Sequence, residues 1–282
     1  MKQILIPTDF SENSWNAIQY ALAFFKNIEC DFYFLHVTLI SNYGGSEFPL
    51  FPSAEVIDKT LLHPGKTALK SLVKKIKKQD TNPGHNFHLI NTYNYFVDAV
   101  KEQIEEKYID LIVMGTKGAS GLSEIILGSN TGDIITQVKC PVLIVPEKAV
   151  FSIPKEIAFP TDYNIFYPSA ILNYIVEFVK TYNSAIRILH VAKKDENLTD
   201  FQLENKDFLH DFFMDKKHSF HRITSKKIEA GVQCFVESRN INMIVMVAKN
   251  INLFQRILFR PTVEEISYHI EIPFLVLHEQ KI

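Results

Sequence analysis

The sequence predicts an α/β protein made of two tandem, doubly wound, parallel five-stranded sheets. Short runs rich in Ile, Val, Leu and Phe alternate with segments of helical spacing, and such runs suit strands that are buried on both faces. This alternation occurs twice along the 282 residues. Parallel strands that are joined by helices require right-handed crossovers, which place helices on both faces of each sheet.

An internal repeat supports the duplication. Residues 4–10 and 157–163 share a short apolar run followed by Pro-Thr-Asp and an aromatic residue. Two prolines bracket a seam at 146–154, and we therefore expect one domain over 1–148 and a second over 149–282. Three further matches follow in the same order, namely 35–37 with 189–191, 110–114 with 242–246, and 140–145 with 272–277.

In the first copy, apolar residues at 15, 18, 22 and 25 predict a helix after the first strand, with Ser11 as its N-cap. A second apolar stripe, from Leu69 to Ile76, predicts the helix before the third strand. The stretch 38–65 is rich in glycine and proline and is predicted to be an inserted mobile loop. Strands are expected at 3–8, 32–37, 86–91, 110–114 and 142–145.

The second copy repeats this plan with fewer residues between its second and third strands. Its strands are expected at 155–160, 186–191, 219–223, 243–247 and 274–277. The last strand of each copy, 142–145 and 274–277, is an apolar sheet edge that needs cover. We therefore expect the two domains to pack as a pseudo-twofold intramolecular dimer through these strands.

Composition narrows the range of partners and locations. The 30 Lys and Arg nearly balance the 32 Asp and Glu, so a general attraction to nucleic acid or to a membrane is not expected. The first residues contain neither a basic region nor a long apolar stretch, and we expect a cytoplasmic protein. Cys30, Cys140 and Cys234 lack metal-ligand spacing and are predicted to be small, reduced core residues.

The candidate site lies at the carboxyl ends of the first copy's strands, where open parallel sheets bind ligands. Glycines in the motif G-x2-G-x9-G-S let the backbone approach a phosphate, and the free N–H groups of the following helix attract anions. In the alternative interpretation, these glycines only shape a loop and Ser129 only caps a helix. The candidate residues are Pro7, Thr8, Asp9, Val37, Met114, Gly115, Gly118, Gly128, Ser129, Asn130 and Thr131.

These residues closely resemble the nucleotide-binding signature of the universal stress protein family, here as a tandem member. The Pro7-Thr8-Asp9 start and the Lys-Cys-Pro-Val lead-in at 139–142 add to the resemblance. It implies a Rossmann-like, adenine-nucleotide alpha-hydrolase-like fold that binds ATP, with Mg²⁺ as an optional companion. Asp9 would lie near adenosine, the Val37 backbone would meet adenine, and the glycines with 129–131 would surround ribose and phosphates.

The second copy lacks all three glycines of this motif. Val247, Asn250 and Arg260 stand at those positions, and Pro261 removes one N–H at the start of the following helix. The phosphate cradle is therefore predicted to be lost, and the second domain is expected not to bind nucleotide. Binding of some other anion by Arg256 and Arg260 stays open.

Three other patterns are given structural interpretations. His218 and His221 with His210 and Asp211 could form a zinc site, but no cysteine accompanies them, and surface histidines are favoured. The equivalent strands end in His36 and His190, for which packing is favoured over catalysis because the copy without glycines also has one. The Lys-rich run at 74–78 is predicted to be a solvated helix end.

The favoured function is ATP binding by a stress-response or regulatory protein, with slow or no hydrolysis because no base for water activation is evident. An adenylating enzyme or flavoprotein subunit, and a nucleotide-free interaction scaffold, are the alternatives. The sequence leaves open the protein partner and whether the chain forms a homodimer.

Overall fold

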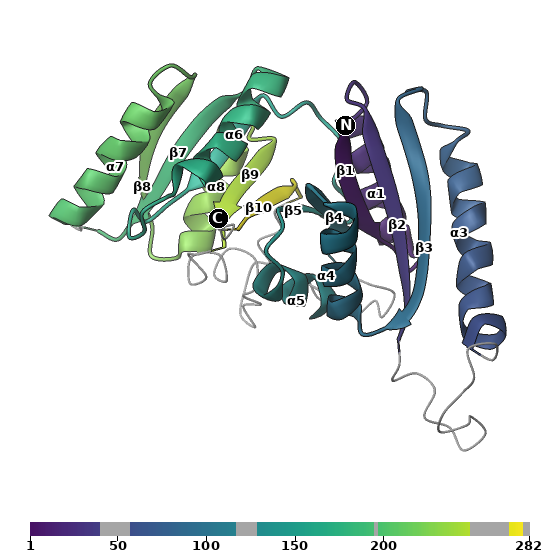
Figure 1. Cartoon of the computed structure of the whole chain (residues 1–282). Coiled ribbons are helices and arrows are strands. Elements are labelled where there is room, and N and C mark those ends of the chain that lie inside the picture. The colour runs from purple at the N-terminus through teal and green to yellow at the C-terminus, as the bar shows by residue number, and fades with distance from the viewer. Residues whose placement is uncertain (40–56, 117–128, 195–196, 249–270, 279–282) are drawn as a thin grey trace. The chain divides into compact units, whose positions relative to one another are not determined.

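The computed structural model of the chain describes residues 1–39, 57–116, 129–194, 197–248 and 271–278. Two compact units divide the chain between Glu147 and Lys148. Unit 1 contains the described residues up to 147, and unit 2 contains those from 148 onward. Each unit is an α/β domain, in agreement with the predicted fold class (Figure 1).

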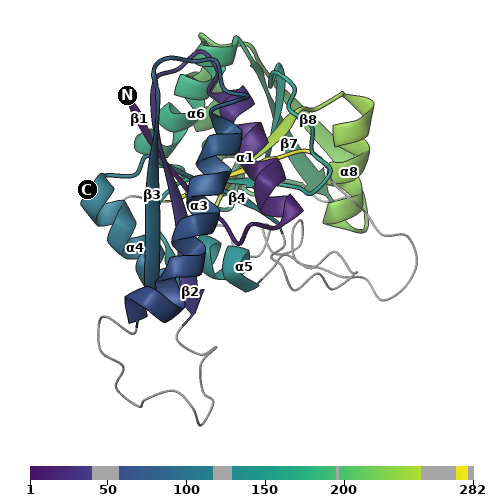
Figure 2. The same cartoon turned by 90° about the vertical axis from the view of Figure 1, so that its right-hand side faces the viewer.

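Unit 1 alternates strands and helices around one parallel sheet with the order β3-β2-β1-β4-β5. Helices α1 and α3 lie side by side on one face of this sheet (Figure 2), and α4 contacts strands β1 to β3. The elements are β1 (Lys2–Pro7), α1 (Glu12–Phe24), β2 (Cys30–Leu39), η2 (Ile57–Leu62), α3 (His63–Ile76), β3 (His85–Asn94), α4 (Phe96–Lys107), β4 (Leu111–Gly115), α5 (Ser129–Gln137) and β5 (Val142–Val145).

Unit 2 repeats the same strand order, as β8-β7-β6-β9-β10. The predicted strands of both units agree with the observed ones to within two residues at nearly every end. The elements are β6 (Glu156–Pro160), α6 (Ser169–Tyr182), β7 (Ala185–Ala192), α7 (Asp200–Phe213), β8 (His218–Thr224), α8 (Ile228–Ser238), β9 (Met243–Val247) and β10 (Phe274–Leu277).

Helix α1 begins as predicted at its N-cap Ser11, whose side chain accepts a hydrogen bond from the Ser14 backbone N–H at 3.2 Å. The helix ends at Phe24, so Phe25 is its C-cap and not part of the helical stripe. Trp15 is only half-buried, and the Lys75 ammonium lies 3.5 Å from the centre of its ring. One member of the Lys-rich run therefore makes a cation–π contact, while its neighbours in the run are exposed.

The predicted loop at 38–65 is wrong over its described part. Strand β2 reaches Leu39, and η2 leads directly into α3. Pro64 stands in the first turn of α3, where its missing N–H costs no helical hydrogen bond, so this proline helps to start a helix. Leu61 is 2% exposed and anchors the segment. Residues 40–56 of the predicted loop lie outside the described residues.

A buried histidine fastens the start of β3 to two neighbouring turns. The His85 side chain is 0% exposed, and its Nδ1 lies 3.0 Å from both carboxylate oxygens of Asp80. Its Nε2 lies 3.2 Å from the Phe25 carbonyl and 3.1 Å from the Ile28 carbonyl. The Asn82 side-chain amide nitrogen lies 3.1 Å from the same Nε2, and the ring thus joins the turn before β3 to the turn after α1.

Burial tests the prediction that the cysteines are core residues. Cys30 and Cys140 are buried as predicted, and burial raises the pKa of each thiol to about 12. Cys234 is exposed on α8, so its assignment to the core is wrong. Within the described ranges, no helix has the length and apolar character that crossing a bilayer requires.

Candidate functional site

The candidate site of unit 1 lies where the direction of strand order changes. Strand β1 pairs with β2 on one side and with β4 on the other, so the crossovers that leave β1 and β4 diverge at their carboxyl ends. Crevices at such switch points are where open α/β sheets bind ligands. Pro7 ends β1, while Met114 and Gly115 end β4.

The turn after β1 is held by Thr8. Its side chain is buried, its hydroxyl lies 3.0 Å from the Ser14 hydroxyl, and it accepts the Phe10 N–H at 3.1 Å. Phe10 takes a φ of 65°, a left-handed conformation that is costly for an aromatic residue. The Thr8 hydroxyl therefore stabilises a strained turn and is not displayed for a ligand.

Asp9 is exposed and is oriented by its neighbour. Its Oδ1 accepts hydrogen bonds from the Ser11 N–H at 3.0 Å and from the Ser11 hydroxyl at 2.6 Å. Ser11 in turn caps α1, so the carboxylate is fixed beside a helix N-terminus. Such an arrangement positions an acceptor at the mouth of the crevice without deep burial.

Val37 presents its backbone beyond the end of β1. The Leu35 carbonyl accepts the Thr8 N–H at 2.8 Å, and the pairing of β1 with β2 ends at this point. Backbone groups of a strand alternate in direction, so the N–H and C=O of Val37 point to the same side as those of Leu35. A flat heterocycle with one donor and one acceptor could pair with them.

His36 precedes Val37 on β2, and its side chain has a packing role. Its Nδ1 lies 2.9 Å from the Thr8 carbonyl, and its ring packs against that of Phe10 at a tilt of 38° with centroids 4.6 Å apart. A Cβ added at Gly65 would lie 2.7 Å from the His36 ring, so α3 approaches closely here only because residue 65 is a glycine. The packing role predicted for His36 is supported.

Gly115 is a glycine because of Asn13. A Cβ built on Gly115 would lie 2.7 Å from the Asn13 Oδ1 and 2.9 Å from its Cγ. Asn13 is buried in the first turn of α1. The predicted reason for this glycine was approach of a phosphate, whereas the structure provides a reason within the protein itself.

Residues 129–131 form the first turn of α5. Ser129 and Asn130 are exposed there, where the free N–H groups of a helix attract anions. Thr131 is 3% exposed, and its hydroxyl donates to the Gly115 carbonyl at 3.0 Å. This hydroxyl joins α5 to the end of β4 and was predicted instead to face a phosphate. Gly118 and Gly128 lie outside the described residues.

The contact between Gly115 and Asn13 leads to a stability prediction. We expect Gly115→Ala to lower the free energy of unfolding by about 1–3 kcal/mol, because the added methyl group overpacks a buried contact. Adding Asn13→Ala should recover part of this loss, so the two substitutions will not be additive. Urea unfolding of the wild type, both single variants and the double variant measures this coupling. Strict additivity would contradict the assignment.

The corresponding edge of unit 2 keeps the turn but is closed. Thr161 repeats the contacts of Thr8, because its hydroxyl lies 2.8 Å from that of Tyr167 and accepts the Tyr163 N–H at 2.9 Å. The Nδ1 of His190 lies 3.0 Å from the Thr161 carbonyl, as in the His36 contact. Val247 ends β9 at the position of Gly115.

Helix α7 covers this turn in unit 2. Gln202 donates to the Asp162 carbonyl and Asn205 to the Tyr163 carbonyl, each at 2.8 Å. Tyr163 is 2% exposed, whereas its counterpart Phe10 is 37% exposed. Gln202 is the third residue of α7, and a glycine is the third residue of the equivalent helix α3.

The histidines considered for zinc are not gathered into one site. The Nε2 of His218 lies 3.2 Å from the Nδ1 of His210, whereas the Nε2 of His221 lies 2.7 Å from the Ser219 hydroxyl. Residues 218 and 221 point to opposite faces of β8, because side chains alternate along a strand. Among the residues that the structure describes, no cluster of three or more His, Cys, Asp or Glu side chains could hold a metal.

Sequence reasoning missed the polar residues behind the site. Asn13 and Ser14 are buried at the start of α1, and Gln202 and Asn205 close the turn of unit 2. One signal was available, since a hydroxyl stands six residues after the threonine in both copies, at Ser14 and Tyr167. Gln202 and Asn205 have no such repeated signal.

Comparison with known proteins adds a family match. Residues 1–146 match the model described as "Universal stress protein family". The chain is similar to universal stress protein MJ0531 of Methanocaldococcus jannaschii, at 36% identity over 144 residues that cover 51% of this chain and 81% of the relative. Universal stress protein MJ0577 of the same organism is 29% identical over 160 residues, covering 52% of this chain and 96% of that protein.

A solved structure resembles nearly the whole chain. A universal stress protein from Archaeoglobus fulgidus covers 98% of this chain, and 96% of that protein is covered, with a TM-score of 0.68. The sequence identity is 18%, so this likeness is one of fold.

Proposed function

Because the chain belongs to the universal stress protein family, we propose that it is an ATP-binding stress-response or regulatory protein whose first unit holds the nucleotide. The observation that carries the proposal is the contrast between the two switch points. In unit 1, the Val37 backbone, the exposed Asp9 carboxylate and the exposed residues Ser129 and Asn130 follow the strands that meet at the switch point. In unit 2, Tyr163 and the amides of α7 fill the equivalent place.

Each part of ATP has a matching group in unit 1. Adenine would pair with the N–H and C=O of Val37, and Asp9 would accept hydrogen bonds from the adenosine portion. The glycines at 115, 118 and 128 with Ser129 and Asn130 would surround the ribose and phosphates. Thr131 would act through its backbone, since its hydroxyl is bonded to Gly115.

Hydrolysis would be slow or absent in this arrangement. Asp9 is the carboxylate that the proposal places beside the nucleotide, and its Oδ1 is already bonded to Ser11. Its place beside adenosine suits orientation of the sugar more than activation of water at the γ-phosphate. Mg²⁺ would be held mainly by phosphate oxygens and water, as is usual for a cation that keeps much of its hydration shell.

Two other functions predict different behaviour. An adenylating enzyme or flavoprotein subunit would consume ATP with a particular substrate or carry a flavin. An interaction scaffold would purify without nucleotide and show no thermal shift with ATP. The closed edge of unit 2 fits a scaffold role for that unit alone.

The test combines mass spectrometry with calorimetry. The purified chain is denatured, the released small molecules are identified, and ATP is titrated into nucleotide-free protein. We expect adenine nucleotide in the released fraction.

Asp9→Ala should weaken the binding of ATP by about 1–3 kcal/mol, the usual range for losing a hydrogen bond to a charged group. The equivalent variant Asp162→Ala is the matched control and should leave the affinity unchanged. Unaltered affinity of Asp9→Ala would remove this residue from the site.

A further inference from the structure

Helix α7 of unit 2 carries an unusual concentration of exposed apolar side chains. Phe201 is 53% exposed, Leu203 42% and Met214, its C-cap, 71%. Phe166, from the turn before α6, is 53% exposed and its ring lies 4.9 Å from that of Phe208. Apolar surface gathered in this way on a soluble domain usually marks a place of interaction.

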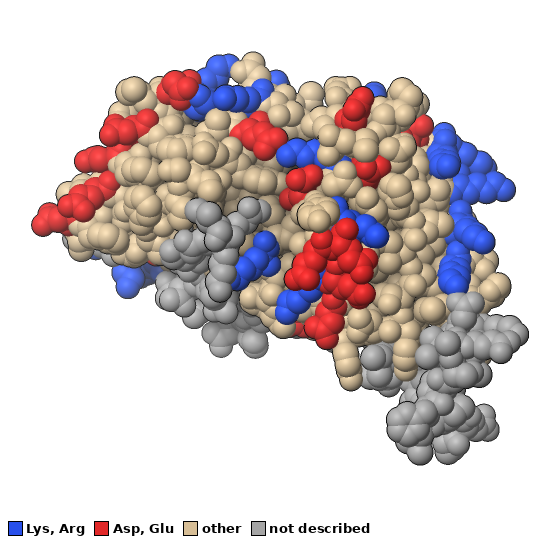
Figure 3. All heavy atoms as spheres, in the orientation of Figure 1, with Lys and Arg blue, Asp and Glu red and all other residues tan. Residues whose placement is uncertain are grey.

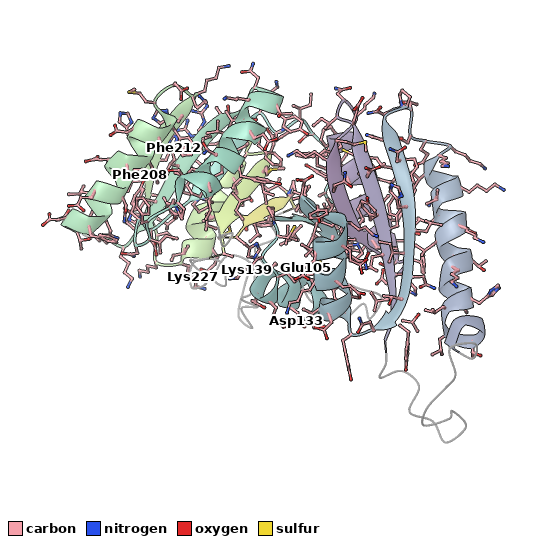
Figure 4. All side chains as sticks on the ribbon, viewed as in Figure 1. Glu105, Asp133, Lys139, Phe208, Phe212 and Lys227 are labelled. Atoms are coloured by element: carbon pink, nitrogen blue, oxygen red, sulfur yellow. The ribbon has the colours of Figure 1, made fainter. Side chains whose placement is uncertain are left out.

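The aromatic residues follow one stripe of the helix. Phe201, Phe208 and Phe212 are separated by seven and four residues, a spacing that places side chains on the same face of an α-helix. The rings of Phe208 and Phe212 are 6.1 Å apart, and Figure 4 shows these two side chains next to each other along α7. We call Phe166, Phe201, Phe208 and Phe212 the aromatic stripe.

The core-facing side of α7 is a different one. Gln202, Leu209 and Phe213, again spaced by seven and four residues, are buried. Folding of unit 2 therefore uses this second face, and the aromatic stripe is left beside it with its outer rings accessible.

An acidic row borders the aromatic stripe. Asp200, Glu204, Asp207 and Asp211 are separated by four, three and four residues, and all four are exposed. Figure 3 shows acidic side chains following one another along α7. The helix thus displays negative charge next to apolar rings along its whole length of 14 residues.

We propose that this face of α7 is the docking site for a basic amphipathic helix of another protein. The partner's apolar side chains would cover the aromatic stripe, and its Lys or Arg side chains would face the acidic row. Two copies of this chain that met through α7 would oppose their acidic rows, and anionic lipid would be repelled likewise. Charge complementarity therefore selects a cationic protein segment.

The probe is a fluorescent 18-residue helical peptide built from Leu on one face and Lys on the other, titrated with the full chain while anisotropy is recorded. We expect saturable binding that weakens with salt, because screening reduces attraction between exposed charges. Phe201→Ser combined with Phe166→Ser should weaken binding by roughly tenfold or more, as loss of central aromatic contacts does at interfaces. Glu204→Lys with Asp207→Lys should weaken binding and flatten the salt dependence.

The matched control variants change exposed residues that are distant in sequence from α7. Val150→Ser removes an apolar side chain that is 86% exposed, and Glu105→Lys reverses an exposed charge on α4; both should bind the peptide like the wild type. The proposal fails if the α7 variants bind as tightly as these controls, or if a peptide with Glu in place of Lys binds equally well. Self-association or binding to anionic vesicles that depends on the aromatic stripe would also overturn it. Circular dichroism checks that each variant is folded.

Discussion

A calorimetric titration of the whole chain with ATP is expected to give one site per chain, although the chain contains two units of the same fold. The second unit has Val247 in place of Gly115 and a buried Tyr163 in place of the more exposed Phe10. Losing two hydrogen bonds to charged phosphates at about 1.5–3 kcal/mol each would weaken a site by roughly 10²–10⁴-fold. Only unit 1 should therefore titrate below about millimolar ATP.

The control uses the predicted phosphate cradle. Gly128→Val should abolish the single site, because a branched side chain would occupy the space for phosphate, and Gly118→Val should do the same. Thermal unfolding of both variants without ATP should resemble that of the wild type. Two comparable sites in the wild-type titration, or near-normal ATP affinity in either variant, would contradict the prediction that unit 1 alone binds ATP.

Replacing His85 by alanine is expected to lower the free energy of unfolding by about 3 kcal/mol, one of the larger effects that a single substitution can have. The change removes a fully buried ring and leaves the Asp80 carboxylate, 8% exposed, without its nitrogen partner. It also removes one of the hydrogen-bond partners of the Phe25 and Ile28 carbonyls. Urea unfolding at neutral pH measures the loss.

His88 provides the control on the same strand. Its Nε2 lies 3.1 Å from the Asp31 Oδ1, but its side chain is 45% exposed, and polar contacts at such exposed sites contribute about 0–1 kcal/mol. His88→Ala should therefore cost much less than His85→Ala. Equal losses of unfolding free energy in the two variants would show that the buried contacts of His85 contribute no more than the exposed contact of His88.

Strands were predictable because their signal is local. A short apolar run between two helical segments, such as Leu111 to Met114, predicts a buried strand. A similar run occurs in the second copy, which favours a strand over a buried helix. The helix at 57–65 was missed because Pro64 and Gly65 were interpreted as loop residues. Pro64 is instead placed in the first turn of a helix, and Gly65 is required by the nearby His36 ring. The second contact involves a residue far away in the sequence, so it could not be predicted from a local pattern.

The places of the candidate residues in the fold were predictable, and their contacts were less so. Strand ends and switch points follow from topology, which places Asp9, Val37 and Gly115 at one edge. Individual roles depend on which side chains occupy the space behind them. Thr131 bonds to Gly115 and the Gly115 position is restricted by Asn13, and neither pairing has a counterpart in motif spacing.

The threonine turn after the first strand of each unit has a thermodynamic consequence. Its hydroxyl pair and its histidine contact occur in both units, so these contacts do not depend on the three glycines of the motif. A ligand that meets such a prebuilt turn need not order that part of the chain, and the entropy of immobilisation was already lost when the domain folded. Substitutions that remove ligand contacts from one unit would therefore leave the fold of that unit intact.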